Sequence, residues 1–273
     1  MDLSLPTSDH PIGIFDSGLG GLTVLRELLK SFPKERFLYL GDTARLPYGN
    51  KSSATIRDYL EQNIEFLLNH RVKAIVVACN SASSVLEEDE PWPVPVYGVI
   101  QPGARTALQV SQTRRIGVIG TRATIGAHAY IYALKKIDSG VQIFEQACPL
   151  LVPLVEEGWE DDPLTNLVVY RYLNPLKQVD VDTLILGCTH YPALKNAIGN
   201  VMGANVALVD SAHAIAELIH EDVAAGRLVA ASATNPEERF RLLTTDVNDG
   251  FKTVAARLMA PHPIQTLIHV HLR

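Results

Sequence analysis

The sequence predicts an α/β protein with two pseudo-symmetric, doubly wound domains, each built on a mainly parallel sheet, and an active site in the cleft between them. Two observations favour this class. Short runs of β-branched residues alternate with segments whose apolar residues recur at helical spacing, a pattern typical of parallel sheets covered by helices. Several of these runs also recur in the same order in the second half of the chain, which indicates an internal duplication.

The first half is expected to contain four strands and two long helices. The strands are short and almost wholly apolar, as buried parallel strands are. Ser52 or Ser53 suits the N-cap of the second helix, because a serine hydroxyl accepts a hydrogen bond from a backbone N–H of the first turn. In chain order the elements are strand Ile12–Phe15, helix Leu22–Phe32, strand Phe37–Leu40, helix Ser53–Asn69, strand Ala74–Ala78 and strand Val96–Ile100.

The second half repeats this alternation. Asp162 and Pro163 mark the start of a helix, because aspartate is a favourable N-cap and proline fits the first helical turn. The residues of this helix expected to face the core are Leu164, Leu167, Val168 and Tyr172. The expected strands are Ile116–Ile119, Val141–Phe144, Thr183–Gly187 and Val206–Val209.

The chain after Ser211 begins with a helix that ends at Gly226. The apolar face of this helix consists of Ile215, Leu218, Ile219 and Val223. We expect this last segment to pack back on the first domain. The predicted domains are therefore residues 1–98 together with 212–273, and residues 99–211.

The duplication is clearest where the chain approaches two cysteines. Val72–Asn80 matches Val181–Thr189, since each has an apolar run followed by cysteine and a hydrogen-bonding residue, and Ile12–Phe15 matches Ile116–Ile119. Four intervals also have the same length of 22 positions, namely Ser17 to Tyr39, Thr121 to Ile143, Cys79 to Gln101 and Cys188 to Asp210. Together these matches favour a duplication over chance.

Composition excludes several classes of protein. The 273 residues suit one large or two modest domains, and 24 basic against 30 acidic residues give a net charge of -6, so nucleic acid and anionic membranes are not expected as partners. No apolar run approaches the roughly 20 residues of a membrane span, and no signal peptide is visible. Three widely spaced cysteines suit a reducing compartment. A cytoplasmic globular protein is expected.

Residues able to do chemistry follow the expected strands of both halves. Ligands bind at the carboxyl ends of parallel strands, so these segments should meet in one cleft. They are Asp16-Ser17-Gly18 and Cys79-Asn80-Ser81 in the first half, and Gly120-Thr121 and Cys188-Thr189-His190 in the second. Two thiols would then face each other.

The three cysteines have different interpretations. Cys148 is expected to be a small buried apolar residue, which is the usual state of a free cysteine. Cys79 and Cys188 occupy equivalent positions in the two halves, which favours a functional role. A zinc site formed by these two and His190 is not expected, because a closed site needs four ligands and there is no Cys-x-x-Cys pair.

Local sequence leaves three roles open. Asp16 and Ser17 begin a glycine-rich segment that lacks the spacing of a dinucleotide or nucleotide site, and they could simply cap a helix. Tyr48, in a turn, could be a wall of the substrate site or a surface aromatic. His190 could be an ordinary loop histidine or could tune the thiol of Cys188.

Two thiols across a cleft suit one reaction in particular. A carbon acid held between them can lose a proton to one thiolate and regain a proton from the opposite thiol, which inverts the carbon centre. Acid–base catalysis of this kind needs groups whose pKa can be brought near ambient pH, and a thiol is such a group.

The motifs resemble those of the glutamate racemase family. The similarity covers nearly the whole chain from Pro11 and depends on Asp16-Ser17-Gly18-Leu19-Gly20-Gly21, Gly41-Asp42-Thr43-Ala44-Arg45-Leu46-Pro47-Tyr48-Gly49, Ala78-Cys79-Asn80-Ser81-Ala82-Ser83 and Gly187-Cys188-Thr189-His190-Tyr191-Pro192. The resemblance implies an enzyme that interconverts L- and D-glutamate without pyridoxal phosphate or a metal, and that supplies D-glutamate for bacterial peptidoglycan.

The resemblance also implies roles for individual residues. Cys188 would take the α-proton of L-glutamate and Cys79 that of D-glutamate, assisted by Asp16, His190 and Glu156. The residues that would bind substrate are Asp16, Ser17, Tyr48, Gly49, Asn80, Ser81, Thr121, Thr189 and His190. Ser81 stands where the family usually has threonine, which affects substrate fit more than the type of reaction. A homodimer is left open.

Three other activities stay open on the sequence. A racemase or decarboxylase of the same superfamily could act on another small acid, such as aspartate or a hydantoin. A cysteine hydrolase could use Cys188 with His190 as base, which would leave Cys79 without a role. A non-catalytic amino-acid-binding protein would not need both thiols.

Overall fold

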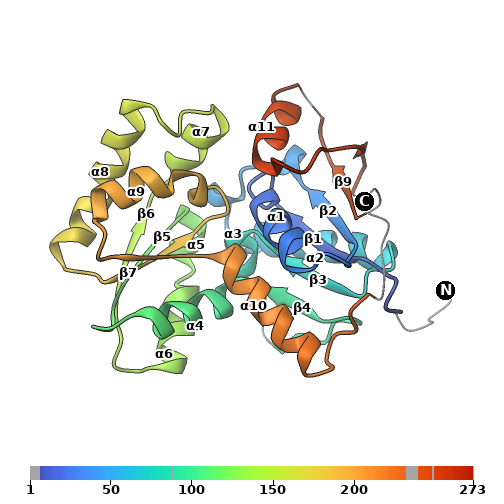
Figure 1. Cartoon of the computed structure of the whole chain (residues 1–273), viewed down its shortest axis with the longest axis horizontal. Helices are drawn as coiled ribbons and strands as arrows, with labels where there is room; N and C mark the ends of the chain where they lie inside the picture. Colours follow the sequence, from blue (N-terminus) through green and yellow to red (C-terminus); the bar gives the residue numbers. More distant parts are fainter. Residues whose placement is uncertain (1–6, 88, 232–238, 248, 273) are drawn as a thin grey trace.

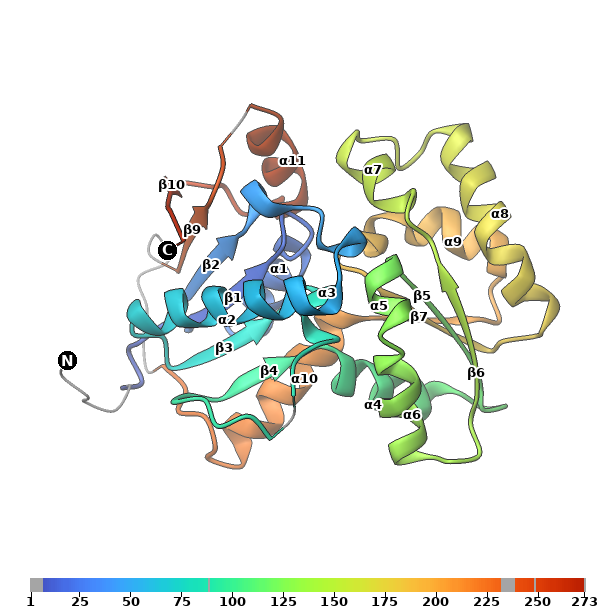
Figure 2. The same ribbon diagram turned by 180° about the vertical axis from the view of Figure 1, so that it is seen from behind.

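The computed structural model describes residues 7–87, 89–231, 239–247 and 249–272. These residues form two parallel sheets with helices packed on both faces of each (Figure 1). The same two layered units are seen from behind in Figure 2. The predicted fold class is confirmed. Within the described part of the chain, no helix has the length and apolar character needed to cross a membrane.

Six strands form the first sheet, namely β1 (Ile12–Asp16), β2 (Phe37–Gly41), β3 (Ala74–Val77), β4 (Val96–Gly98), β9 (Phe240–Thr244) and β10 (Leu267–His269). Their order across the sheet is β10-β9-β2-β1-β3-β4. Four strands form the second sheet, namely β5 (Arg115–Gly120), β6 (Gln142–Ala147), β7 (Thr183–Gly187) and β8 (Ala207–Asp210). Their order is β6-β5-β7-β8.

The helices account for most of the remaining described chain. The α-helices are α1 (Leu22–Ser31), α2 (Ser53–Asn69), α3 (Asn80–Ser83), α4 (Ile100–Val110), α5 (Arg122–Gly126), α6 (Ala129–Ile137), α7 (Leu151–Glu156), α8 (Pro163–Gln178), α9 (Lys195–Met202), α10 (Ser211–Ala224) and α11 (Asp249–Met259). Three short 3-10 turns are η1 (Thr43–Arg45), η2 (Tyr48–Asn50) and η3 (Tyr191–Leu194).

Each sheet is covered by an apolar core on both faces. In the first unit, which we define as the six-stranded sheet with its helices, one core contains residues of α1, α10 and α11 and the other contains residues of α2. In the second unit, the four-stranded sheet with its helices, α8 and α9 cover one face, and α4 and α6 cover the other. Burial on both faces explains why the strands lack polar alternation.

The internal duplication is visible in the strand order, since β2-β1-β3-β4 in one sheet corresponds to β6-β5-β7-β8 in the other. Ile12 pairs with Ala74, and Ile116 pairs with Thr183, as the matched sequence runs predict. The equal intervals of 22 positions do not mark equivalent residues, however. Phe37 lies 25 positions after its partner Ile12, whereas Ile143 lies 27 positions after Ile116, because the connections differ in length.

Two sequence predictions about element boundaries and faces need correction. The strand expected over Val96–Ile100 stops at Gly98, and α4 begins at Ile100. Pro102 lies in the first turn of α4. The backbone N–H groups of a first turn have no acceptor within the helix, so the N–H that proline lacks costs no helical hydrogen bond.

The helix after Asp162 forms as predicted but buries a different face. Leu164 and Leu167 point outward and are 47% and 67% exposed, while Val168 and Tyr172 are only partly buried. The hydroxyl of Thr165 donates to the carbonyl of Trp159 at 2.6 Å and turns Thr165 inward. The face that is buried consists of Thr165, Val169, Leu173 and Leu176.

The C-terminal segment returns to the first unit. β9 pairs with β2 in parallel, and β10 pairs with β9. Ile215 and Ile219 of α10 lie in the core of the first unit, with Leu218 and Val223 packed against it. The predicted cap of α2 is also confirmed, since the backbone N–H of Thr55 donates to Ser52 Oγ at 3.2 Å. The domain limits at 98/99 and 211/212 stay a prediction.

A buried ion pair ties four distant segments of the first unit together. Lys73 Nζ lies 2.8 Å from Glu35 Oε2, and both side chains are almost fully buried. The same ammonium donates to the carbonyls of Ser8 and Val229, each at 2.9 Å. The carboxylate accepts the backbone N–H of Ala231 at 2.6 Å. The pair therefore joins the start of β3 to the N-terminal residues, to the segment before β2 and to the segment after α10.

Replacing Glu35 by glutamine leaves the ammonium of Lys73 buried without its anionic partner. We expect E35Q to lower the free energy of unfolding by about 3–5 kcal/mol, the usual cost of breaking a buried ion pair. Urea unfolding followed by circular dichroism measures the change. The control is E27Q, which removes the exposed pair Glu27–Lys30 (3.7 Å) and should cost less than about 1 kcal/mol. Equal changes in the two variants would contradict the expectation.

Candidate active site

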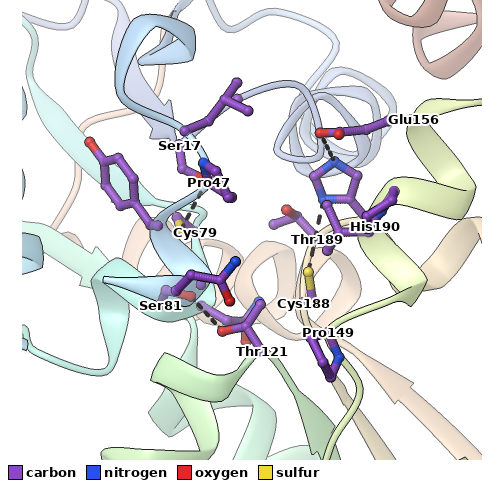
Figure 3. A pocket seen from close by; sticks show the side chains of 18 residues that line it. Ser17, Pro47, Cys79, Ser81, Thr121, Pro149, Glu156, Cys188, Thr189 and His190 are labelled. Carbon is purple, nitrogen blue, oxygen red and sulfur yellow. Dashed lines mark hydrogen bonds and ion pairs between the residues drawn. The ribbon is translucent and has the colours of Figure 1, made fainter. Parts of the chain in front are cut away.

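A pocket of about 780 Å³ lies where the carboxyl ends of the two sheets meet (Figure 3). Of the twelve predicted site residues, eleven line this pocket, namely Ser17, Tyr48, Gly49, Cys79, Asn80, Ser81, Thr121, Glu156, Cys188, Thr189 and His190. Asp16, the twelfth, is fully buried behind the wall. The structure therefore brings together residues that are up to 174 positions apart in the sequence.

The two equivalent cysteines lie on opposite walls of the pocket. Cys79 follows β3 and precedes α3, and Cys188 follows β7 directly. Figure 3 shows their sulfur atoms on the two sides of the cavity. They are 5% and 7% exposed, so a small molecule between them would be largely removed from water. Cys148 is buried outside the pocket, as expected, with its Sγ 3.5 Å from the carbonyl of Gln146.

The environment of Cys79 favours the neutral thiol. Burial, together with the nearby carboxylate of Asp16, raises the pKa of Cys79 to about 12. The hydroxyl of Ser17 lies 3.6 Å from Cys79 Sγ and only partly opposes this rise. Cys79 therefore holds its proton at neutral pH.

Cys188, by contrast, lies beside a histidine. His190 Nδ1 lies 3.9 Å from Cys188 Sγ, and His190 Nε2 lies 3.4 Å from Glu156 Oε1. Burial alone would lower the pKa of His190, but its contacts with Cys188 and Glu156 outweigh burial and raise this pKa to about 10. His190 is therefore an imidazolium at neutral pH, and its charge stabilises negative charge on the sulfur of Cys188.

Asp16 joins the two units behind the pocket. Its carboxylate accepts the backbone N–H of Gly18 at 3.0 Å and the hydroxyl of Thr189 at 3.3 Å. Burial raises the pKa of Asp16, while the charge of His190 and these hydrogen bonds oppose the rise. The N-cap of α1 is Gly21, with no side-chain cap. Asp16 and Ser17 are thus not the caps of this helix, which was one of the open interpretations.

Two glycines allow the units to touch. A Cβ at Gly20 would lie 2.2 Å from Thr189 Oγ1 and 2.6 Å from His190 Nδ1. A Cβ at Gly49 would lie 2.7 Å from Thr121 Cβ. All three distances are far below van der Waals contact, so any side chain here would push the units apart. The glycines of the two loop motifs therefore set the width of the pocket.

Asn80 offers a donor that has no partner in the part of the chain that the structure describes. Its Oδ1 accepts the hydroxyl of Tyr130 at 2.8 Å and that of Ser211 at 3.3 Å, which fixes the orientation of the amide. Its buried Nδ2 has no hydrogen-bond partner among the described residues. Buried donors are seldom left unpaired, so this amide is suited to an acceptor on a ligand.

Three hydroxyl groups form a cluster on the neighbouring wall. Ser81 Oγ lies 2.9 Å from Thr121 Oγ1 and 3.2 Å from Thr124 Oγ1, and the two threonine oxygens are 3.0 Å apart. Thr121 also caps α5 by accepting the backbone N–H of Thr124. Sequence reasoning missed Thr124, although its position three residues after a capping threonine is where such a contact is expected.

Tyr48 is a wall of the pocket and not a surface aromatic. It is 1% exposed, and its hydroxyl donates to the carboxylate of Asp42. Asp42 also accepts Arg45 Nε at 2.6 Å and the hydroxyl of Thr245 at 3.1 Å. The sequence analysis gave Asp42 no role, yet it directly follows β2, at the same edge of the sheet as Asp16. This buried carboxylate holds the Tyr48 turn in place.

No group of three or more histidine, cysteine, aspartate or glutamate side chains that could hold a metal ion occurs among the residues described.

The raised pKa of Cys79 gives a pH-dependent prediction. In a Cys148→Ala/Cys188→Ala background, we expect the rate of alkylation of Cys79 by iodoacetamide to rise about tenfold per pH unit between pH 8 and 10, because its pKa of about 12 leaves the thiolate scarce throughout. Mass spectrometry of timed samples measures the rate. A plateau by about pH 9.5 would indicate an ordinary cysteine and contradict the assignment.

Comparisons with known proteins agree with this geometry. The profile of the family Asp/Glu/Hydantoin racemase matches residues 24–219. A glutamate racemase from Geobacter metallireducens is 46% identical over 250 residues, covering 91% of this chain and 92% of that protein. The crystal structure of a glutamate racemase isoform from Bacillus anthracis matches with a TM-score of 0.91 and 37% identity, over 97% of this chain and 99% of that one.

A further crystal structure, of glutamate racemase from Francisella tularensis in complex with D-glutamate, matches with a TM-score of 0.88 and 33% identity, over 97% of this chain and 99% of that one. The family profile and these similarities extend over most of the sequence, and they agree with the resemblance that the motifs indicated. The chain belongs to the family of Asp/Glu/hydantoin racemases.

Proposed function

We propose that this protein interconverts L- and D-glutamate by proton transfer at Cα between two cysteines, without a cofactor, and so supplies D-glutamate for peptidoglycan synthesis. The observation that carries the proposal is the position of Cys79 and Cys188 on opposite walls of one pocket. The similarity to glutamate racemases, one of them crystallised with D-glutamate, supports glutamate as the substrate.

The unlike surroundings of the two cysteines supply one acid and one base. Cys188, beside the imidazolium of His190, acts as a thiolate and takes the α-proton of L-glutamate. Cys79, which keeps its proton, donates that proton to the opposite face of the planar carbanion. D-glutamate leaves a neutral Cys188 and a Cys79 thiolate behind, and the reverse reaction begins from that state. One proton is taken and one is given in each turnover.

The α-proton of an amino acid is only weakly acidic, so the protein has to stabilise the charge that moves onto the substrate carboxylate. The free amide of Asn80 and the hydroxyls of Ser81 and Thr121 are donors that lie in the wall of the pocket. Fixed donors in a site that excludes water stabilise developing charge more than mobile water does. The neighbouring lining residues Ser17, Tyr48, Gly49 and Thr189 complete the substrate site in this proposal.

Asp16 and Glu156 act in this proposal through their neighbours. Glu156 lies beside His190 Nε2 and favours the imidazolium. Asp16 accepts the hydroxyl of Thr189 and raises the pKa of Cys79, which keeps the acid protonated. Each carboxylate therefore acts on one of the two cysteines.

A cysteine hydrolase is the less well supported alternative. It would use Cys188 with His190 as base and would form a thioester. The pKa of His190, about 10, keeps the imidazole protonated and makes it a poor general base at neutral pH. Cys79 would also have no role, although it lies in the same pocket.

The direct test is incubation with L-glutamate in heavy water, with no added cofactor or metal. We expect D-glutamate that carries deuterium at Cα, measured by chiral chromatography and mass spectrometry. Cys79→Ala and Cys188→Ala should each lose about 10²–10⁴-fold in rate, the usual contribution of a general acid or base. Cys148→Ala is the matched control and should keep its rate. Near-normal racemisation in either active-site variant would exclude the two-cysteine mechanism.

The charge of His190 predicts the alkaline limit of activity. Since the pKa of His190 is about 10, the rate should be steady at neutral pH and fall as the imidazolium loses its proton near pH 10. The ratio kcat/KM measured from pH 7 to 11, with circular dichroism to show that the protein stays folded, tests this. A decline centred below pH 8 would mean that a different group controls the limit, and His190→Asn should lack the limb near pH 10.

A further inference from the structure

The C-terminal helix α11 reaches across to the second unit through one side chain. Arg257 Nη2 donates to the carbonyl of Val155, in α7, at 2.6 Å and lies 3.2 Å from Glu160 Oε1. Both figures of the whole chain show α11 and α7 as neighbours from different units (Figure 1 and Figure 2). Arg257 is therefore a contact between the units that lies outside the pocket.

The guanidinium also fills the turn that follows α7. Gly158 has a positive φ of +77°, and a Cβ there would lie 2.4 Å from Arg257 Nη1. The backbone of this turn is thus shaped to receive the arginine, because a side chain on residue 158 would occupy the same space. The arginine is 39% exposed, so its ion pair with Glu160 alone contributes little. The charge-assisted hydrogen bond to a backbone carbonyl gives the contact a defined geometry.

The carbonyl that Arg257 binds belongs to the residue before Glu156. Val155 is fully buried in the core of the second unit, and Glu156 is the last residue of α7. The carboxylate of Glu156 projects into the pocket beside His190, which in turn contacts Cys188 (Figure 3). Glu156 is one-third exposed and has no other anchor given by a hydrogen bond or ion pair in the described structure. The backbone at Val155 therefore sets the position from which this side chain reaches His190.

We propose that Arg257 is a positioning residue, which ties α11 to the turn after α7 and thereby holds Glu156 against His190. The inference rests on the proposed function only in the sense that His190 acts on Cys188. It gives the C-terminal helix, whose residues are far in the sequence from those that line the pocket, a defined influence on the active site. Arg257 touches neither substrate nor cysteine, and it acts through the position of one carboxylate.

The α11 helix is itself firmly placed on the first unit. Leu258 and Met259 are in the core of that unit, and Arg26 of α1 donates to the carbonyl of Leu258 at 2.9 Å. Movement of the first unit relative to the second would therefore be passed through Arg257 to α7.

The direction in which the pKa of His190 shifts when Arg257 is replaced separates a positioning role from a direct effect of the arginine's charge. The titratable groups facing His190 are Cys188, Glu156 and Asp16. Removing the positive charge of Arg257 would by itself raise the pKa of a nearby histidine. Releasing Glu156 from His190 lowers that pKa, because a carboxylate that favours the imidazolium is withdrawn. The two explanations for an effect of Arg257 thus predict opposite shifts.

The experiment is a titration of His190 by NMR in full-length protein carrying ¹³C-labelled histidine, with the signal assigned through His190→Asn. In Arg257→Gln we expect the pKa of His190 to fall by about one unit, the usual size of losing one nearby opposite charge. Arg257→Lys should show a smaller shift, since one ammonium can reach only one of the two acceptors. An unchanged or raised pKa in R257Q would overturn the proposal.

A double variant and a matched control complete the test. Glu156→Gln should lower the pKa of His190, and adding R257Q to E156Q should cause no further shift, because both changes act through one carboxylate. A further shift of the His190 pKa in the double variant would contradict the proposal that Arg257 acts through Glu156. The control is Arg105→Gln, which removes an ion pair of similar exposure between α4 and α10 (Arg105 to Glu221, 2.8 Å) without touching α7. It should leave the titration unchanged.

Racemisation is a separate readout. The titration needs no turnover, so failure of the proposed function would leave it intact. If glutamate is racemised, R257Q should lower kcat about tenfold and move the alkaline limit to lower pH, with thermal unfolding close to that of R105Q. An unchanged alkaline limit in R257Q would count against the positioning role.

Discussion

The pocket depends on a contact between two backbone loops that leaves no room for a side chain. Gly20, after β1, lies against Thr189 and His190, after β7, so closely that a Cβ would overlap both. The hydroxyl of Thr23 reaches the carbonyl of Thr189 at 3.2 Å, and Thr189 donates to Asp16. These contacts bring the carboxyl ends of the two sheets together. The separation of the two cysteines, the burial of the site and the position of the hydroxyl cluster all follow from this approach.

The duplication places the two cysteines at equivalent positions, and their neighbours then make them different. A carboxylate near Cys79 opposes loss of its proton, whereas an imidazolium supported by a second carboxylate lies beside Cys188. Burial increases both effects, because charges interact more strongly where water is excluded. A nearly symmetric fold therefore supports an asymmetric arrangement of charge.

Much of this could be predicted from sequence. The alternation of apolar runs predicted strands β1 to β8, and the residues that follow these strands had to meet at one edge of each sheet. With the residues that the family resemblance added, eleven of the twelve expected residues line the pocket. Other features depend on contacts that no local pattern contains. The predicted inward face of α8 was wrong because both of its sides are apolar. The side that is buried carries Thr165, whose hydroxyl donates to the carbonyl of Trp159, a contact that no local pattern contains. Asp42, Thr124 and Arg257 are recognised only when the elements they contact are placed.

The unequal cysteines also bear on how a racemase of this kind can be controlled. The two enantiomers of an amino acid have the same free energy in water, so kcat/KM must be equal in both directions at every pH, whatever the protein does to its thiols. The asymmetry between Cys79 and Cys188 cannot favour one product. In the proposed mechanism it determines instead what happens between turnovers, since each conversion of L- to D-glutamate leaves the protons exchanged and the high pKa of Cys79 makes that state short-lived. In that mechanism the enzyme has a favoured starting state, and its return to that state is a kinetic step of its own.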